Sequence, residues 1–281
     1  MARPYGPVGA GDRTGRPYLR GPAPPSPMTD HVRTEAADGV LRLTLARPEK
    51  KNALTRAMYE ALTAALDAAA ADPAVRVVLL HGEGGSFTAG NDLADFVQHP
   101  PTGEDSPVFR FLLAAATFPK PLVAAVEGHA VGIGTTVLLH CDLAWAAPSA
   151  RFSLPFVNLG LVPEAASSLL LPAAVGPKRA AELLLFGEPF GAEEAARMGL
   201  VNGVVDDPLG HALARARALA QKPPAALRLT RALLRRPHAE AVAATLSEEG
   251  RLFVERLAGP EAQEALAAFV EKRPPDFSRF D

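Results

Sequence analysis

The chain has 281 residues, of which 48% are hydrophobic and 21% charged, a composition typical of a globular protein with one large buried core. Its net charge of −2 excludes a generally basic nucleic-acid-binding protein, and its single cysteine, Cys141, excludes an intramolecular disulfide and a cysteine cluster for a metal. The sequence has no apolar run of about 18 residues and no signal-peptide core, so we expect no membrane span and a cytoplasmic location.

The first 29 residues are dense in proline, glycine and arginine and have almost no apolar periodicity. Such a segment cannot bury enough apolar surface to offset the entropy lost on ordering, so residues 1–29 are expected to form a disordered tail. Met28 stands just before the first patterned sequence. We hypothesise that the protein naturally starts there and that the residues before it are not native; an intact mass that includes Met1 would refute this.

Residues 32 to 80 predict a hairpin, a helix and a buried strand. Two short strands over residues 32–45 flank a turn at Asp38 and Gly39, and apolar residues alternate in the second strand. Thr55 is a good N-cap for a helix that ends before Pro73. The continuous apolar run over residues 75–80 is typical of a parallel strand covered on both faces.

Two glycine-rich loops follow predicted buried strands. The strand over residues 75–80 leads into the first loop and the strand over residues 122–126 into the second, with a polar segment and a helix over residues 108–117 between them. The glycines are Gly82, Gly84, Gly85 and Gly90 in the first loop and Gly128, Gly132 and Gly134 in the second. Open α/β sheets bind ligands where parallel strands end, and a helix start presents unpaired N–H groups. The two loops are therefore expected to offer two backbone N–H groups to one oxygen; the alternative is a flexible loop and a turn into a core helix.

One carboxylate, Glu164, follows a mostly apolar segment over residues 152–163, which itself follows a predicted buried strand over residues 142–147. A backbone anion site with a carboxylate near it is what proton transfer next to a carbonyl requires. The alternative is that Glu164 is an exposed charge in the first turn of a helix after Pro163.

Helices dominate the sequence beyond Glu164. Six are predicted, over residues 165–185, 192–198, 209–220, 225–234, 239–257 and 260–270. We therefore predict an α/β core over residues 30–205 and a C-terminal helical region over residues 206–281.

Six ordered blocks of the chain resemble the crotonase superfamily, the enoyl-CoA hydratase/isomerase superfamily. They are RPEKKNALT, SFTAGNDL, PKPLVAAVEGHAVGIG, CDLAWAAPSARFSLPF, LGLVPEAASS and AAFVEKRPPDF, and they extend from about residue 30 to residue 277. The resemblance implies an α/β fold built as a spiral of ββα units, a helical C-terminal region used in trimerisation, and acyl-CoA thioesters as ligands. We expect a homotrimer or a hexamer of two trimers, no cofactor other than the coenzyme A of the substrate, no metal, and neither nucleic acid nor membrane as a partner.

The resemblance also implies site residues. The two N–H groups that hold the thioester oxygen correspond to those of Ala89 and Ile133. The coenzyme A contacts correspond to Lys51, Asn52 and Ala53, to the loop of Ala89, Gly90, Asn91, Asp92 and Leu93, and to Lys272. The residues expected to line the substrate pocket are Phe156, Asn158, Thr136 and Leu161. From its position in the sequence alone, Asp92 is predicted to cap a helix. The alternative interpretation of Lys51 is that it is a solvated surface charge.

Departures from the family pattern narrow the predicted activity. Hydratases of the family use two glutamates, and this chain has Thr136 and Phe156 at the matching positions, neither of which is a base. Glu164 instead stands where hydratases have glycine, in PEAASS rather than PGAGG, which resembles the peroxisomal type of Δ3,Δ2-enoyl-CoA isomerase. We predict an isomerase that converts 3-enoyl-CoA into trans-2-enoyl-CoA through Glu164. The alternatives are an enoyl-CoA hydratase or other crotonase-type acyl-CoA enzyme, and a non-catalytic acyl-CoA-binding homologue.

Overall fold

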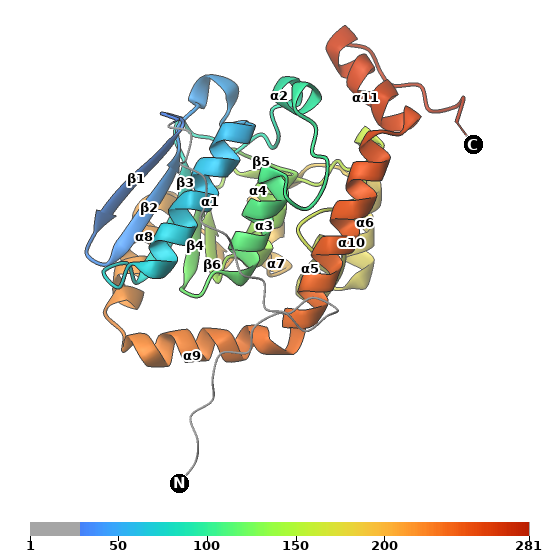
Figure 1. Cartoon of the computed structure of the whole chain (residues 1–281). Helices are drawn as coiled ribbons and strands as arrows, with labels where there is room; N and C mark the ends of the chain where they lie inside the picture. Colours follow the sequence, from blue (N-terminus) through green and yellow to red (C-terminus); the bar gives the residue numbers. More distant parts are fainter. Residues whose placement is uncertain (1–28, 281) are drawn as a thin grey trace.

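The structure, a computed structural model, describes residues 29–280 (Figure 1). The tail predicted over residues 1–29 lies, apart from Thr29, outside the described residues, and so does the hypothetical start at Met28.

Six strands form the main sheet in the order β1-β2-β3-β4-β6-β9. Their bounds are β1 (Val32–Ala37), β2 (Val40–Leu45), β3 (Val77–Gly82), β4 (Leu122–Val126), β6 (Leu143–Ala146) and β9 (Gly203–Val204). β1 and β2 form the predicted antiparallel hairpin, and the other neighbours in the sheet are parallel. Because β3 and β4 are parallel neighbours, both glycine-rich loops start at the same edge of the sheet, as predicted.

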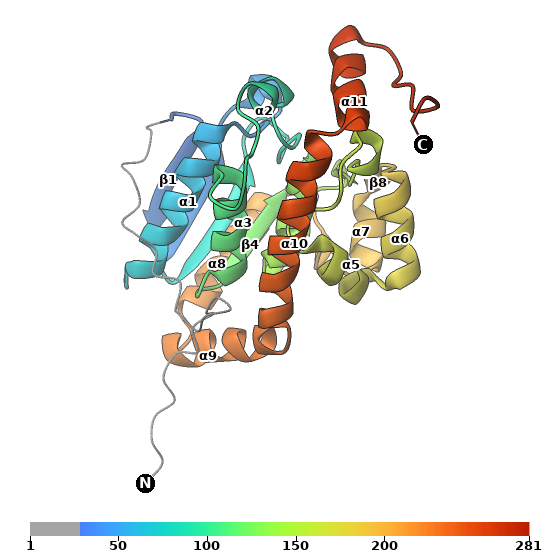
Figure 2. The same cartoon turned by 45° about the vertical axis from the view of Figure 1, so that its right-hand side comes forward.

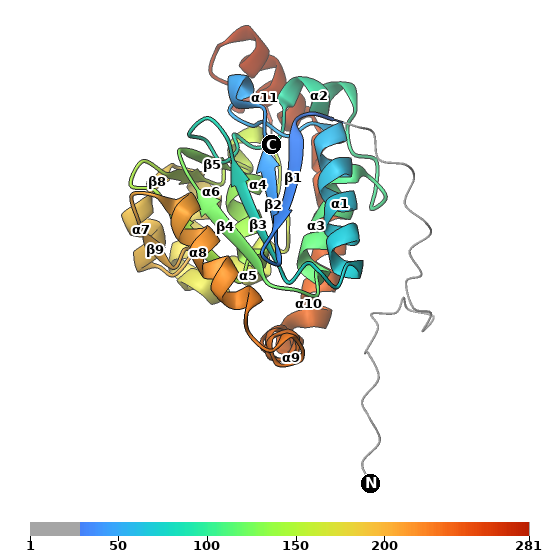
Figure 3. The same ribbon diagram turned by 90° about the vertical axis from the view of Figure 1, so that its left-hand side faces the viewer.

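Helices cover both faces of this sheet (Figure 3). They are α1 (Arg56–Ala71) and α3 (Pro107–Thr117) on one face and α8 (Pro208–Ala220) on the other. On β3, Val78 and Leu80 belong to the core under α1 and α3, whereas Val77 and Leu79 belong to the cluster under α8. Successive side chains of a strand point to opposite faces, which explains the continuous apolar run. The packed core thus includes a helix of the predicted C-terminal region, and the boundary at residue 205 stays a prediction.

Helix α1 begins where the sequence predicts it. The hydroxyl oxygen of Thr55 accepts a hydrogen bond from the Met58 N–H, and Asp72 is the C-cap. Met58, Leu62 and Leu66 recur four residues apart and are fully buried. Burial of each such side chain stabilises the fold by roughly 1.5–3 kcal/mol.

A small second sheet carries the chain away from the second glycine-rich loop. It consists of β5 (His129–Val131), β7 (Arg151–Ser153) and β8 (Phe190–Gly191), strands too short for a sequence pattern to reveal. The helix expected in this loop is a single turn, α4 (Ile133–Thr136), that continues as the 3-10 helix η2 (Val137–His140). Four other short helices lie in connections: η1 (Pro48–Lys50), α2 (Leu93–Gln98), η3 (Val157–Leu159) and η4 (Arg236–His238).

The helix predicted over residues 165–185 is in fact two helices, α5 (Ser167–Val175) and α6 (Pro177–Phe186). Gly176, at φ 84°, separates them, and Pro177 has no N–H with which to continue the first helix. The remaining predicted helices are confirmed: α7 (Ala192–Arg197), α9 (Pro224–Arg235), α10 (Ala239–Leu257) and α11 (Pro260–Glu271). α10 packs on α3 and α5, and α11 extends beyond the body of the molecule (Figures 1 and 2). Over residues 29–280, no helix is both long and apolar enough to cross a bilayer.

Candidate active site

The two glycine-rich loops contact each other through their backbones. The Thr88 N–H donates to the His129 carbonyl at 2.8 Å, and the Thr88 carbonyl accepts from the Val131 N–H at 3.1 Å. A Cβ atom at Gly134 would lie 2.7 Å from Cγ2 of Thr88, so only glycine allows α4 to come this close to the first loop. The prediction that the loops face one another is confirmed.

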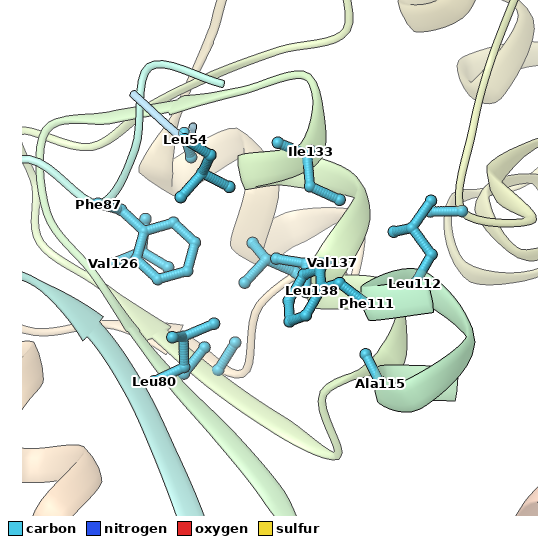
Figure 4. Packing of buried hydrophobic residues seen from close by; sticks show 14 of the residues in the cluster. Leu54, Leu80, Phe87, Phe111, Leu112, Ala115, Val126, Ile133, Val137 and Leu138 are labelled. Atoms are coloured by element: carbon cyan, nitrogen blue, oxygen red, sulfur yellow. The ribbon is translucent and has the colours of Figure 1, made fainter. Parts of the chain in front are cut away.

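The first available backbone donor is the N–H of Ile133, the first residue of α4. The first N–H groups of a helix have no partner within that helix. Gly132, at φ 54°, turns the chain into α4, so Ile133 itself has an ordinary helical backbone. The Ile133 side chain is buried with Leu54 and Phe87 in the core (Figure 4). A β-branched residue therefore fits at this position.

The second donor differs from the one predicted. The Ala89 N–H already donates to the Lys51 carbonyl at 2.9 Å, so the prediction of Ala89 as a donor to a ligand oxygen is wrong. Leu54 forms a parallel bridge with Asn91 by bonding to the residues on either side of it. The Leu54 N–H donates to the Gly90 carbonyl at 2.8 Å, and the Leu54 carbonyl accepts from the Asp92 N–H at 2.9 Å. In a parallel bridge of this kind the N–H of the central residue points away from its bridge partner. The Asn91 N–H is thus directed to the side where β5 and α4 lie, and it replaces Ala89 in the candidate site.

A buried tyrosine on α1 holds the side chain of Asn91. The Tyr59 hydroxyl donates to Oδ1 of Asn91 at 2.5 Å. Burial, and after it the nearby Glu164 carboxylate, raises the pKa of Tyr59 well above its usual value, so the hydroxyl stays protonated as a donor. The sequence pattern does not indicate this role of Tyr59, because its place in the helical repeat is that of a core residue.

Glu164 is 1% exposed, and neither of its carboxylate oxygens has a hydrogen-bond partner among residues 29–280. Burial, followed by the charge of Glu249, raises the pKa of Glu164 to about 8. The alternative interpretation of Glu164 as an exposed charge in the first turn of a helix is wrong, because the side chain is buried and α5 begins only at Ser167.

The backbone after Glu164 has an uncommon conformation. Ala165 and Ala166 are left-handed, at φ 66° and φ 55°, which costs on the order of 1–3 kcal/mol for each non-glycine residue. Nε2 of the buried His140 donates to the Ala165 carbonyl at 2.8 Å. Burial lowers the pKa of His140 to about 4, so the ring is neutral at pH 7. η2 thereby holds the strained loop in place.

A second carboxylate approaches the same loop from α10. Oε1 of Glu249 accepts a hydrogen bond from the Ser168 N–H at 2.9 Å, and the residue is 6% exposed. Oε2 has no partner in the part of the chain that the structure describes. Burial raises the pKa of Glu249, although the N–H groups at the start of α5 oppose the shift. The sequence does not predict Glu249 as a site residue, because nothing in the helical pattern distinguishes it from the exposed Glu248.

Asn52, predicted to contact coenzyme A, has a structural role. Its fully buried amide donates to the carbonyls of Glu83 and Ser86, and its Oδ1 accepts from the Arg47 N–H. The side chain thus ties the turn after η1 to the first glycine-rich loop. It is fully engaged there and has no donor left for a ligand.

The other predicted coenzyme A residues fall into two groups. Lys51 and Lys272 are exposed cations: Nζ of Lys51 lies 3.3 Å from Nε2 of His129, and Lys272 is the C-cap of α11. Asp92 caps α2, as predicted, by accepting from the first N–H groups of that helix, and it also pairs with Arg47 at 2.6 Å. Ala53, Gly90 and Leu93 supply backbone around these groups.

The residues predicted to line the substrate pocket differ in exposure. Thr136 and Phe156 are buried, and Oγ1 of Thr136 has no hydrogen-bond partner within residues 29–280. Leu161 is partly buried against the main core. Asn158 is exposed, and its Oδ1 faces the turn at Gly187, so we leave it out of the candidate site.

A mixed sheet covered by helices, with two glycine-rich loops joined through their backbones at one edge, defines a crotonase-like fold. The family model described as enoyl-CoA hydratase/isomerase matches residues 35–279, and the chain belongs to this family.

Some relatives in the family are named as isomerases and others as hydratases. Enoyl-CoA delta isomerase 2 of Homo sapiens is 33% identical, over 92% of this chain and 69% of its own length. The 2,3-dehydroadipyl-CoA hydratase of Escherichia coli is 37% identical, over 85% of this chain and 94% of its own length. Among solved structures, Pseudomonas aeruginosa OdaA superposes with a TM-score of 0.84 at 50% identity, over 86% of this chain and 99% of OdaA. Family membership therefore does not decide between isomerisation and hydration.

Proposed function

We propose that the protein is an isomerase that converts 3-enoyl-CoA into trans-2-enoyl-CoA. The observation that carries the proposal is the environment of Glu164, a buried carboxyl group whose pKa is raised to about 8. A carboxyl group with such a pKa exchanges a proton readily near neutral pH. Relatives named enoyl-CoA delta isomerase support the proposal.

The reaction requires one acid–base group and one anion site. The Glu164 carboxylate takes a proton from C2, and the electron pair of that C–H bond enters a dienolate whose charge lies on the thioester oxygen. The N–H groups of Asn91 and Ile133 stabilise this oxygen; loss of one such donor typically costs roughly 2.7–4 kcal/mol. Glu164 then returns the proton at C4, which leaves the double bond between C2 and C3 with no atom gained or lost.

The surroundings of Glu164 favour proton return over addition of water. Phe156 is buried and Leu161 packs against the main core, and we propose that these apolar side chains keep water out of the cleft. Thr136, at a position where hydratases of the family have a glutamate, has a hydroxyl group that is not a base at neutral pH.

We propose that coenzyme A lies along the turn of Lys51 and the loop from Gly90 to Leu93, with Lys51 as a cation for its phosphates. Lys272 is proposed to reach the same phosphates in a neighbouring subunit of a homotrimer or hexamer, since α11 extends away from the body of the molecule (Figure 1). Exposed leucines on α9, among them Leu229 and Leu233, support contact between subunits.

An apolar groove of about 720 Å³ lies between the segment after α2 and the helices α10 and α11. One of its walls is Phe96, which packs edge-on against Phe253 of α10, one helical turn beyond Glu249. We propose that the acyl chain beyond C4 leaves the cleft on this side.

Hydration is the second candidate reaction, because Glu249 adds a second carboxyl group near Glu164. Addition of water to a 2-enoyl-CoA uses one group to take a proton from water and another to give a proton to C2.

Product analysis distinguishes the two candidates. The purified protein is incubated with 3-enoyl-CoA and, separately, with trans-2-enoyl-CoA. We expect the first substrate to become the conjugated isomer without a change in mass. A product of the second substrate that has gained water would replace the isomerase proposal with hydration. No turnover of either, with acyl-CoA esters still raising the Tm, would favour a binding protein.

A further inference from the structure

Glu249 is a buried carboxylate that the reaction proposed above does not use. It lies on α10, far from Glu164 in the sequence, and α10 packs on α5 directly after the Glu164 loop. Both carboxylates are more than nine-tenths buried, and three of their four oxygens have no hydrogen-bond partner among residues 29–280.

The two carboxylates share one short turn of backbone. The Glu164 carbonyl accepts a hydrogen bond from the Ser167 N–H at 3.1 Å. The next N–H along the chain, that of Ser168, donates to Oε1 of Glu249 at 2.9 Å. The fourth oxygen of the pair is therefore bound at the start of α5, where the positive end of the helix dipole favours an anion.

The other titratable groups around Glu164 are neutral. Tyr59, from α1, is a protonated phenol, and His140, from η2, is an uncharged imidazole. Among residues 29–280, Glu249 is the group whose charge acts on Glu164, and no cation opposes it. Two carboxylates in one buried site do not both ionise easily, and the one with hydrogen-bond donors ionises first.

We propose that Glu249 is a positioning residue of the catalytic cleft: its carboxylate, anchored by the Ser168 N–H, ionises first, and its negative charge makes Glu164 hold a proton more tightly. The inference rests on the proposed function, since it gives the acid–base group of that reaction its proton affinity. It goes beyond that function because it predicts a coupled pair of carboxyl groups.

The pair has a defined pH behaviour. As the pH rises, Glu249 loses its proton first and Glu164 second, so the active base appears only on the second step. Removal of the Glu249 charge moves the second step to lower pH. Glu249→Gln keeps the shape of the side chain and an acceptor for the Ser168 N–H, so it tests charge rather than packing.

The test is an infrared titration of the carboxyl groups in the full chain, with the pH profile of isomerase turnover as the second measurement. In Glu249→Gln we expect the Glu164 titration, and the rising limb of the pH profile, to move down by about one pH unit or more. The matched control is Glu248→Gln on the same helix, an exposed residue paired with Arg251, which should leave both unchanged. Unchanged titration of Glu164 in Glu249→Gln would overturn the proposal, and so would an equal loss of turnover at every pH.

A second variant covers the outcome in which Glu249→Gln does not fold. Because Glu249 ionises while Glu164 still holds its proton, Glu164→Gln should remove the higher titration step and leave the lower one, that of Glu249, in place. A move of the remaining step to lower pH would show that Glu164 ionised first and would overturn the proposal. The infrared readout needs no turnover. A coupled pair in a protein without isomerase activity would therefore refute the proposed function and leave the coupling intact.

Discussion

Two regions of the molecule bury a glutamate, and they treat its charge in opposite ways. On α11, Glu264 is 5% exposed and accepts hydrogen bonds from Arg273 at 2.5 Å and from the Asp276 N–H at 2.9 Å, which lower its pKa to about 2. In the cleft, Glu164 is 1% exposed, lacks a partner within residues 29–280, and has a pKa raised to about 8. Burial alone does not set the charge of a carboxyl group; the donors around it do.

The difference in hydrogen-bond donors gives the two glutamates different roles, one structural and one suited to proton transfer. Glu264 fastens the segment that contains Arg273 and Arg279 to α11, so its charge is permanent at neutral pH. Glu164 has no hydrogen-bond donor among residues 29–280 and gains no stability from its charge. A group of this second kind is suited to carry a proton.

The sharpest test compares turnover in two variants, Glu164→Gln and Glu264→Gln. We expect the first to lose about 10²–10⁴-fold in isomerase kcat, because an amide cannot take the C2 proton. The second should stay within a few-fold of the unaltered protein at neutral pH. Equal losses in both variants, measured on 3-enoyl-CoA, would remove the distinction between the two glutamates.

The stability of Glu164→Gln should depend on pH. A carboxyl group whose pKa rises from 4.5 to about 8 on folding stabilises the fold fully below pH 4.5, and this stability is lost as the pH rises through 8. Glutamine does not titrate, so the variant does not lose this stability as the pH rises. Its free energy of unfolding, relative to that of the unaltered protein, should therefore increase by on the order of 4 kcal/mol between these pH values, and its relative Tm should rise with it. Thermal unfolding at pH 5 and pH 9 measures it, and a constant difference in Tm would contradict the buried, proton-holding Glu164.

Glu264→Gln should show the reverse dependence. The pKa of Glu264 is depressed on folding, so its contribution is present above pH 4.5 and is lost as the pH falls through about 2. We expect the Tm of the variant to lie below that of the unaltered protein at pH 7 and to approach it in acid. If the deficit in Tm persisted at pH 2, packing rather than the ion pairs would explain it.

The smallest expected effect is that of Tyr59→Phe. The variant keeps the ring in the core and removes the hydrogen bond to Oδ1 of Asn91, which is worth about 0.5–1.5 kcal/mol. We expect kcat to fall roughly three- to tenfold through a less rigid Asn91 N–H. Thr63→Val on the same helix, which removes a hydroxyl bonded only to a backbone carbonyl, is the control and should leave kcat unchanged.

Much of the fold was predictable from local patterns. The hairpin turn at Asp38 and Gly39, the Thr55 cap and the buried strand β3 all follow from neighbouring residues, whose preferences act over a few positions. The break between α5 and α6 was missed, although Gly176 and Pro177 are strong local signals, because the apolar repeat continues across them.

The site was predictable only in part. Glu164 and Ile133 follow from the sequence, but the choice between Ala89 and Asn91 depends on which N–H the Lys51 carbonyl occupies. A hydrogen bond between segments so far apart leaves no trace in the pattern of either. Glu249 was missed for the same reason.

By itself the sequence determined the order of helices and strands, the family and the presence of one acidic residue in an apolar segment, since these depend on residues close together in the chain. Only the tertiary structure decided that this carboxyl group is buried without a donor among residues 29–280, that the Ala89 N–H is bonded to the Lys51 carbonyl, and that α10 brings Glu249 to the same turn. Proton affinity depends on everything that surrounds a group in space, and that environment exists only once the chain has folded.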